Sequence, residues 1–391
     1  MTIATPQGFR AAGVACGLKS TGAKDLALVV NDGSPDACAV AGVFTANRFP
    51  AAPVQWSRAV LADAHTRPRA IVLNSGGANA SSGPEGLKDT EAMAARTAEQ
   101  LGISPREVLV CSTGLIGERL ALPLLLTGID RAAAALDTTD EAAQDAAWAI
   151  LTTDTRPKQA GTQGSYTVAG MAKGAGMLAP QLATMLVVLT TDALITDEIA
   201  QTALTRATAL TFDRLDSDGC MSTNDTVLLL ASGASGITPP LDEFAERVTT
   251  TCHDLAMQLL ADAEGAEHDI AITVDGATTT DAALAVGRAI ARANLVKAAI
   301  YGHDPNWGRI LSAVGTVPEE VAPYQSDQVD IEINHVRVVK NGDPDQPRSL
   351  VDLTERAVTI NVHLHAGPAQ ATIWTNDLTH AYVEENSAYP S

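Results

Sequence analysis

The sequence predicts an α/β protein in which helices and sheets are stacked in layers. Strand-like and helix-like segments alternate along the chain, which is typical of this class. Hydrophobic residues make up 46% of the chain but aromatic residues only 4%, so the core must consist mainly of Ala, Val, Leu and Ile, which allow close packing. With 391 residues, the chain is long for one core, and we expect one large domain or two intimate ones.

The first part of the chain contains short β-like segments, each bounded by Gly, Asn, Pro or Ser, and Ala-rich segments without internal proline. We predict strands over 25–30, 37–44, 70–73 and 108–112, and helices over 86–102 and 140–151.

The second part contains the clearest helical pattern, over about 242–261. Its apolar residues recur at spacings of three and four and form one stripe, as expected for a helix with one buried face. The stripe consists of Phe244, Val248, Cys252, Leu255 and Leu259. We also predict helices over 197–212 and 281–293, and strands over 226–231, 269–274, 297–301, 329–339 and 357–364.

The composition excludes several classes of function. The formal charge of −20 at pH 7 would repel the phosphodiester backbone of nucleic acids and anionic lipid surfaces, so we expect neither nucleic-acid nor membrane partners. A negative field would help to attract a cationic small molecule such as a diamino acid, although general acidity more often serves solubility.

Cysteine usage and hydropathy predict the compartment. The five cysteines are scattered and form no CxxC pair, which argues against a disulfide framework or a thiolate metal site and favours a reducing environment. The N-terminus lacks a basic region followed by an apolar one, and the longest strongly apolar run, around 182–189, is too short to span a bilayer. We therefore expect a soluble, cytoplasmic protein.

Thr184 stands where a glycine-rich loop runs into an apolar, strand-like segment, in GMAKGAGMLAPQLATMLVVLTTDA (170–193). A threonine hydroxyl is a poor nucleophile unless a base adjoins it, and the α-amino group of an N-terminal threonine, with a pKa of about 7.7, is such a base. An N-to-O acyl shift, in which the Thr184 oxygen attacks the Ala183 carbonyl, would create that N-terminus. The local composition alone favours a simpler reading, an ordinary turn with Thr184 as a strand residue.

This segment resembles the self-cleavage segment of the ornithine acetyltransferase family, also called the bifunctional glutamate N-acetyltransferase family of arginine biosynthesis. In that family the threonine of ATML is the nucleophile. Further similar stretches follow in the same order along nearly the whole chain: NSGGANA (74–80), STGLIG (112–117), TTDT (152–155), STNDT (222–226), EGA (264–266), GHDPNWGR (302–309) and ENSAYPS (385–391).

The resemblance implies the layered fold of this family and of DmpA-like self-processing enzymes. It implies that the precursor cuts itself between Ala183 and Thr184 into an alpha chain (1–183) and a beta chain (184–391), which remain associated as a heterotetramer of two alpha and two beta chains or a larger assembly. N2-acetyl-L-ornithine would acetylate Thr184 and release L-ornithine, and L-glutamate would then accept the acetyl group. No cofactor or metal is implied, and the use of acetyl-CoA as a second donor stays open.

The resemblance also implies the roles of individual residues. Thr113 and Gly114 in STGLIG match the family's oxyanion stabilisers, which suits a hydroxyl and an N–H group at the end of a strand. Lys173 can bind a carboxylate and Glu264 an ammonium group; taken singly, both could instead be solvated surface charges, and the C-terminal tail a frayed end. The implied substrate-binding residues are Thr152, Lys173, Thr184, Glu264, Asn386 and Ser391.

Some features depart from the family pattern or suggest other chemistry. The family usually has Asn and Met where this chain has Gln181 and Leu182, and often Asn where Gly77 stands.

His363 and His365, at i and i+2, would share a strand face, but no third metal ligand is evident. The cluster from Asp304 to Arg309 is expected to cap and tie neighbouring segments.

Two alternatives to the transferase remain: a self-processing amidase or aminopeptidase, and a non-catalytic amino acid binding protein.

Overall fold

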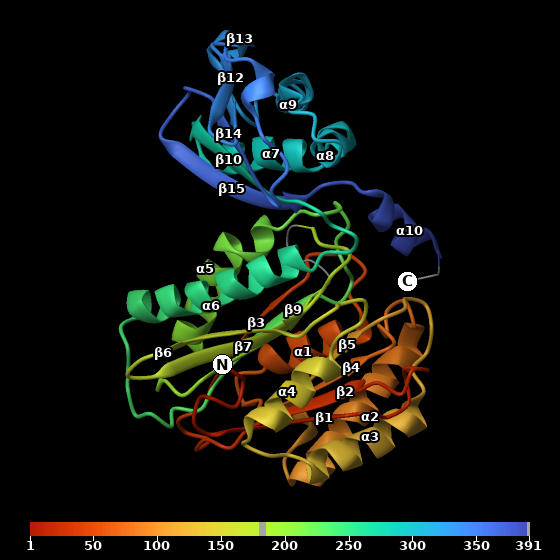
Figure 1. Ribbon diagram of the computed structural model, residues 1–391. Helices are drawn as coiled ribbons and strands as arrows, with labels where there is room; N and C mark the ends of the chain where they lie inside the picture. Colours follow the sequence, from red (N-terminus) through yellow and green to blue (C-terminus); the bar gives the residue numbers. More distant parts are fainter. Residues whose placement is uncertain (180–184, 389–391) are drawn as a thin grey trace.

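The computed structural model describes residues 1–179 and 185–388, and these form three β-sheets with helices packed on them (Figure 1). Two of the sheets lie face to face in the larger part of the molecule. The third belongs to the C-terminal part and has a hydrophobic core of its own. The predicted α/β class is confirmed.

The first sheet has the strand order β1-β2-β4-β5, with β4 and β5 parallel and the other pairs antiparallel. One core joins its outer face to α2 and α3. A second core joins its inner face to α1 and α4 and to the next sheet, so these two helices lie between the sheets. The elements are β1 (Phe9–Val14), β2 (Leu26–Asn31), α1 (Ala52–Leu61), β4 (Ala70–Ser75), α2 (Gly83–Leu101), β5 (Val108–Thr113), α3 (Leu122–Ala134) and α4 (Asp140–Ala149).

The second sheet has the order β3-β9-β8-β7-β6. Its outer face is covered by α5 and α6, and all five residues of the predicted apolar stripe of α6 are fully buried there. β7 and β8 are antiparallel neighbours, with Lys173 opposite Leu186. The elements are β3 (Ala39–Phe44), β6 (Lys158–Gln163), β7 (Thr167–Lys173), β8 (Leu186–Thr191), α5 (Asp197–Leu210), β9 (Thr226–Ala231) and α6 (Leu241–Ala261).

The third sheet has the order β13-β12-β11-β14-β10-β15, and α7 packs against β10 and β15. After β15 the chain leaves this sheet and returns as α10 towards the other two sheets (Figure 1). The elements are β10 (Asp269–Ala277), α7 (Thr280–Ala291), α8 (Asn294–Tyr301), α9 (Trp307–Val314), β11 (Asp330–Ile333), β12 (Val336–Lys340), β13 (Asp343–Pro344), β14 (Ala357–His363), β15 (Ala369–Asn376) and α10 (His380–Ala388).

The predicted strand over 297–301 is wrong, because this segment belongs to helix α8. A short apolar run does not distinguish the two conformations, and here Val296, Ala299 and Ile300 are buried at helical spacing. The segment 329–339, predicted as one strand, is a hairpin of β11 and β12 that turns at Asn334 and His335, both with positive φ. Several elements had no prediction, among them β1, β6, β7 and β15.

The predicted capping and tying role of the cluster from Asp304 to Arg309 is confirmed. Asn306 caps α9 by accepting a hydrogen bond from the Arg309 N–H at 3.3 Å, and the Arg309 side chain donates to the Leu295 carbonyl, which ties two segments together. All five cysteines, which lie within the described ranges, are free of disulfide bonds. Among the described helices, none is both long enough and apolar enough to cross a bilayer.

Candidate active site

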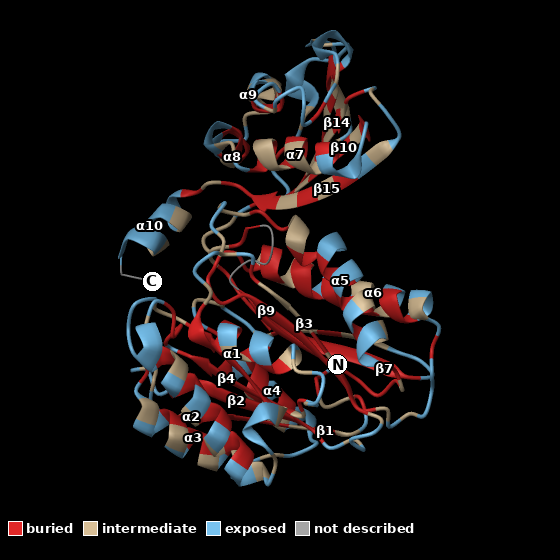
Figure 2. Cartoon of the chain, turned by 180° about the vertical axis from the view of Figure 1, so that it is seen from behind, coloured by how far each residue is buried: buried red, intermediate tan, exposed pale blue. Residues whose placement is uncertain are grey.

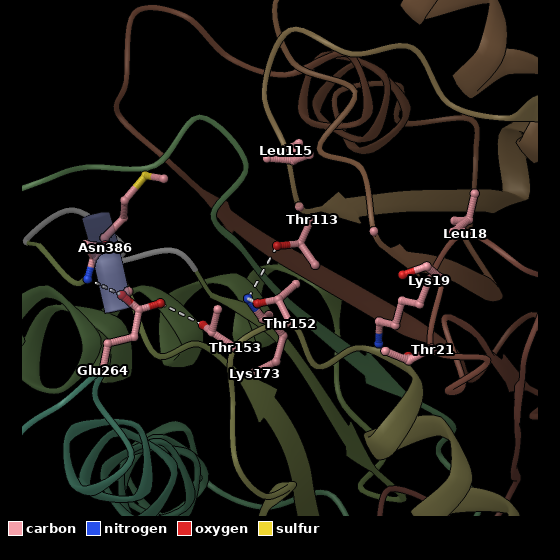
Figure 3. Close-up of a pocket in the computed structure, with 15 residues that line it drawn as sticks. Leu18, Lys19, Thr21, Thr113, Leu115, Thr152, Thr153, Lys173, Glu264 and Asn386 are labelled. Atoms are coloured by element: carbon pink, nitrogen blue, oxygen red, sulfur yellow. Dashed lines mark hydrogen bonds between the residues drawn. The ribbon is translucent and has the colours of Figure 1, made fainter. Parts of the chain in front are cut away.

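A pocket of about 490 Å³ opens where β5 and β7 end (Figure 3). It collects side chains from distant parts of the sequence, including both of the predicted oxyanion residues and four of the predicted substrate-binding residues. Its lining consists of Leu18, Lys19, Ser20, Thr21, Gly76, Thr113, Gly114, Leu115, Thr152, Thr153, Lys173, Gly176, Met177, Glu264 and Asn386.

Thr113 and Gly114 form a tight turn at the end of β5. The Thr113 carbonyl accepts hydrogen bonds from the N–H groups of Gly76 and Gly77, at 3.0 and 2.9 Å. Gly114 has φ +132, and a Cβ there would lie 2.4 Å from the Gly77 nitrogen, so only glycine fits this approach of two backbones. The turn therefore presents the Thr113 hydroxyl to the pocket from a rigid support.

Lys173, the last residue of β7, lies between two threonines of the pocket. Its Nζ donates to Thr152 Oγ1 at 2.7 Å and to Thr113 Oγ1 at 3.4 Å. The side chain is 1% exposed, so the alternative that Lys173 is a solvated surface charge is wrong. Burial lowers the pKa of Lys173, and the negative charge of Asp154 partly opposes this.

Asp154 is a central residue of the site that the sequence analysis did not identify. Its carboxylate accepts hydrogen bonds from the N–H groups of Gly174 at 2.6 Å and Thr152 at 3.1 Å, and it lies 3.8 Å from Lys173 Nζ. Burial alone would raise the pKa of Asp154, but the positive charges of Lys173 and Lys158 bring that pKa below its ordinary value. The lowered pKa thus favours the ionised form of Asp154 beneath the pocket.

Glu264 lies at the opposite end of the pocket, in the loop after α6. Its carboxylate accepts one hydrogen bond from Thr153 Oγ1, at 2.7 Å, and one from Asn386 Nδ2 of α10, at 3.0 Å (Figure 3). A Cβ at Gly176 would lie 2.5 Å from Glu264 Oε2, so a larger residue at this position would clash with the carboxylate. A carboxylate can accept more than two hydrogen bonds, which leaves capacity for a ligand ammonium group.

The wall formed by residues 18–21 was also missed. It is held by Asp25, whose buried carboxylate accepts hydrogen bonds from consecutive backbone N–H groups. Burial would raise the pKa of Asp25, but these hydrogen bonds lower it overall. The sequence signal is a Gly-containing loop that ends at an aspartate before a strand. The donors are Cys16 at 2.5 Å, Gly17 at 3.0 Å, Leu18 at 2.7 Å and Lys19 at 3.1 Å.

Ala183, Thr184 and Ser391 lie outside the described residues. The described chain resumes at Met185, whose N–H donates to Asp225 Oδ1 at 3.1 Å and whose carbonyl accepts from the Thr226 N–H at 3.1 Å. Asp225 is fully buried, and this burial raises its pKa well above the ordinary value. The residue that follows Thr184 in the sequence is thus firmly attached to the STNDT segment.

Neither histidine of NVHLH lines this pocket. His363 ends β14, and His365 lies two residues beyond it with positive φ, so the expectation that they share a strand face is wrong. Their rings are 3.7 Å apart, and each contacts an aspartate: His363 contacts Asp275, and His365 contacts Asp330. Within residues 1–179 and 185–388, no group of three or more His, Cys, Asp or Glu side chains is arranged to hold a metal ion.

The fold and the pocket together define a class of protein. A rigid pocket that holds a threonine hydroxyl at a glycine turn, a buried lysine and a glutamate is typical of an enzyme that acts on a small polar molecule bearing both signs of charge. The chain belongs to the ArgJ family, which matches it over residues 10–391. The resemblance recognised from the sequence motifs is therefore confirmed.

Relatives of known name cover the whole chain. It is 56% identical over 395 residues to the arginine biosynthesis bifunctional protein ArgJ of Bifidobacterium longum (strain NCC 2705), covering 100% of both chains. It is 55% identical over 392 residues to the protein of that name from Streptomyces coelicolor, again covering 100% of both chains. The crystal structure of ornithine acetyltransferase complexed with ornithine from Mycobacterium tuberculosis is 44% identical and covers 47% of this chain and 96% of its own, with a TM-score of 0.42.

Proposed function

We propose that the protein transfers the acetyl group of N2-acetyl-L-ornithine to L-glutamate in arginine biosynthesis, through an acetyl-Thr184 intermediate. The observation that carries this proposal is the pocket itself: Thr113, Gly114, Thr152, Lys173, Glu264 and Asn386, which the family resemblance selected, line one cavity. The two full-length relatives named above carry the name arginine biosynthesis bifunctional protein, and the Mycobacterium tuberculosis enzyme was crystallised with ornithine.

Self-cleavage would prepare the nucleophile. The Thr184 Oγ attacks the Ala183 carbonyl, the peptide bond rearranges to an ester, and water hydrolyses the ester to leave a free α-amino group on Thr184. The resulting alpha chain (1–183) and beta chain (184–391) would stay together, because the second sheet takes β3, β6 and β7 from one and β8 and β9 from the other. The β7–β8 ladder, from Lys173↔Leu186 to Val168↔Thr191, would hold the cut ends in place.

Acetyl transfer would then proceed in two steps. The Thr184 α-amino group takes the proton of the hydroxyl as it attacks the acetyl carbonyl, and it returns a proton to the leaving ornithine amine. The Thr113 hydroxyl and the Gly114 N–H would stabilise the oxyanion, which an aligned pair of donors can do without reorganisation. The glutamate amine attacks the acetyl ester in the second step, which regenerates Thr184 and releases N-acetyl-L-glutamate.

Two charged residues would orient the amino acid. The Lys173 ammonium can pair with the α-carboxylate, and Glu264 can pair with an ammonium group of ornithine. Thr152, Asn386 and Ser391 would add neutral hydrogen bonds. These steps need no metal or cofactor, and an assay with acetyl-CoA in place of acetylornithine decides whether it also serves as donor.

The assembly and location belong to the same proposal. We propose that two alpha and two beta chains form the active particle and that it works in the cytoplasm. The free thiols of Cys16, Cys38, Cys111 and Cys252, all buried, suit a reducing compartment.

Replacement of Thr184 tests the function most directly. The unaltered protein is expected to give two masses under denaturing conditions, which correspond to 1–183 and 184–391. It should turn over and keep releasing ornithine only when glutamate is present, because without glutamate the reaction stops at acetyl-Thr184. Thr184→Ala is expected to give one full-length mass and no acetyl transfer, because it removes the hydroxyl needed for both reactions. Thr250→Ala, on the exposed face of α6, is the matched control and should be cut and active.

The alternatives predict different results. Continued turnover of ornithine release in the absence of glutamate would indicate an amidase. An uncut chain that binds ornithine without transferring acetyl groups would indicate a binding protein, and a processed, active Thr184→Ala variant would refute the mechanism.

A further inference from the structure

Four buried side chains of alternating charge run beneath the pocket, in the order Asp262, Lys158, Asp154 and Lys173. Lys158 Nζ donates to Asp262 Oδ2 and to Asp154 Oδ1, both at 2.5 Å, and Asp154 Oδ2 lies 3.8 Å from Lys173 Nζ. The Lys158 and Asp154 side chains are both 0% exposed. We refer to these four residues as the buried charge chain.

One end of the buried charge chain supports the acetyl-transfer end of the pocket. Asp154 accepts from the Thr152 N–H and from the Gly174 N–H, so it fixes the loop that carries Thr152 and the residue directly after Lys173. Lys173 in turn donates to Thr152 Oγ1 and Thr113 Oγ1. The position of the lysine at the oxyanion residue thus depends on Asp154.

The other end reaches the Glu264 loop. Asp262 accepts from the Thr155 N–H at 3.0 Å and also from the Thr155 hydroxyl. It precedes Glu264 by two residues, and the Glu264 N–H donates to the Ala175 carbonyl at 3.1 Å. Lys158 therefore joins the loop of residues 152–155 to the loop that carries Glu264.

Such an arrangement is costly for stability alone. Taking an ammonium group out of water is strongly unfavourable, and apolar residues of similar volume often stabilise a protein at least as well as a buried ion pair. A buried chain of charges is better suited to fixing geometry, since hydrogen bonds that involve an ammonium or carboxylate group are shorter and stronger than neutral ones.

We propose that Asp154 and Lys158 are positioning residues of the acetyl-transfer site, which hold the Lys173 ammonium against Thr113 and Thr152 and fix its distance from Glu264. This inference rests on the proposed function. It assigns neither residue a contact with the substrate, so both act through Lys173 and Glu264.

The pKa of Lys173 distinguishes a positioning role from a purely structural one. Burial lowers the pKa of Lys173, Asp154 raises that pKa, and Lys158 lowers it. Removal of the Asp154 charge should therefore lower the pKa of Lys173, while removal of the Lys158 charge should raise it. The charged groups that act on Lys173 from the surrounding elements are Asp154, Lys158, Glu264 and Asp225, together with Lys19, on whose own pKa Lys173 acts.

The test compares the pH dependence of kcat/KM for acetylornithine in two variants. Asp154→Asn keeps the shape of the side chain but removes its charge, and we expect the alkaline limb to move to lower pH by about one unit, as is typical for loss of an opposite charge within 4–6 Å. Lys158→Met/Asp262→Asn removes one cation and one anion together, and we expect a smaller move to higher pH. Lys88→Met, at an exposed ion pair of α2, should leave the profile unchanged.

The outcomes distinguish a positioning role of Asp154 and Lys158 from a purely structural role. Opposite movements of the alkaline limb, with the acid limb of the Thr184 amine unchanged, support the inference. A uniform fall in kcat/KM at all pH values, with both limbs in place, overturns it.

A second measurement makes the result independent of the proposed function. The pKa of Lys173 can be followed by NMR titration of lysine-labelled protein, with the Lys173 signal assigned by its loss in Lys173→Met. Opposite shifts in the two variants would support the positioning role even if the unaltered protein transferred no acetyl group, in which case only the proposed function fails. The absence of opposite shifts overturns the inference even if acetyl transfer is confirmed.

Discussion

Buried charge is distributed very differently in the two parts of the molecule. In the part that holds the first two sheets, Asp25, Lys158, Lys173 and Asp225 are at most 1% exposed. In the third sheet the core is aliphatic, and its ion pairs, such as Arg337–Asp345, lie at the surface with side chains 42% and 28% exposed. Figure 2 shows that most strands of the first two sheets are buried along their whole length, whereas β10 and β15 of the third sheet alternate between buried and intermediate residues.

The buried polar residues of the C-terminal part gather where it meets the rest of the chain. Lys297 donates to the carbonyls of Ser217 and Asn376, both at 2.5 Å, and to Thr375 Oγ1 at 3.1 Å. Beside it, the buried His268 contacts Asp377 at 2.7 Å. In the C-terminal part, polar burial thus marks the junction, and we infer that the third sheet serves as an apolar scaffold that places α10 and Asn386 at the pocket.

The comparison predicts that loss of a buried cation affects activity most in the pocket. Lys173→Met should reduce kcat/KM for acetylornithine by about 100-fold or more, a loss comparable to that of one oxyanion-hole donor, because the variant removes the ammonium beside Thr113 and leaves Asp154 without that partner. Steady-state kinetics on processed protein measure the effect. A rise in KM would assign Lys173 mainly to carboxylate binding, and a fall in kcat to the transition state.

Lys340→Met is the matched control in the third sheet, since Lys340 is exposed at the end of β12. It should leave kcat, KM and Tm unchanged. If Lys173→Met kept full activity, the pocket would not be the acetyl-transfer site.

The sequence predicted the elements whose periodicity matches their burial. The stripe of α6 is one example, because a helix with one buried face repeats apolar residues at the helical spacing. α8 was misassigned because its apolar run is as short as a strand. β6 was missed because KQAGTQ has neither β-branched enrichment nor alternation, and it forms a strand through pairing with β7.

The residues of the candidate site were likewise predicted only in part. Thr113, Lys173 and Glu264 were predicted because family motifs contain them, and the structure brings them to one pocket. Asp154 and Lys158 were not predicted, although Asp154 belongs to the TTDT motif. Lys158 contacts Asp262, 104 positions away, and Asp154 contacts the Gly174 N–H, 20 positions away. Such tertiary contacts leave no periodicity in the sequence.

The junction should respond to loss of its buried cation in stability. Lys297→Met leaves the carbonyls of Ser217 and Asn376 without their donor, and we expect the free energy of unfolding to fall by about 2 kcal/mol, since an unsatisfied buried polar group costs 1–3 kcal/mol. Chemical denaturation at neutral pH measures this. Leu295→Ala on the same helix, where Leu295 is 65% exposed, is the control and should show no change.

The pH dependence sharpens this prediction. Burial lowers the pKa of Lys297 from 10.5 to about 8, so between these values the unfolded chain binds a proton that the folded protein does not. The free energy of unfolding of the unaltered protein should therefore rise with pH across this window relative to Lys297→Met. A difference between the two proteins that stays constant from pH 8 to 10.5 would contradict a buried, neutral Lys297.

Two glycines, one at the pocket and one beside the third sheet, test the difference between the two parts of the molecule with the smallest expected effects. At Gly176, a Cβ would lie 2.5 Å from the flexible end of the Glu264 side chain, so Gly176→Ala should displace the carboxylate and raise KM by about tenfold, equivalent to about 1.4 kcal/mol, with little change in Tm. At Gly287, a Cβ would lie 2.9 Å from Ile373 Cγ1 between α7 and β15. Gly287→Ala should lower the free energy of unfolding by about 1 kcal/mol, because overpacking costs 1–3 kcal/mol and alanine returns part of this through its helix propensity.

The two glycine variants are informative because each is expected to change only one quantity. Kinetics and thermal unfolding, measured on the same preparations, should show a KM effect without a Tm effect for Gly176→Ala and the reverse for Gly287→Ala. A rise in KM for Gly287→Ala would mean that strain in the third sheet reaches the pocket through β15 and α10, and the third sheet would then be part of the catalytic machinery and not a scaffold for Asn386.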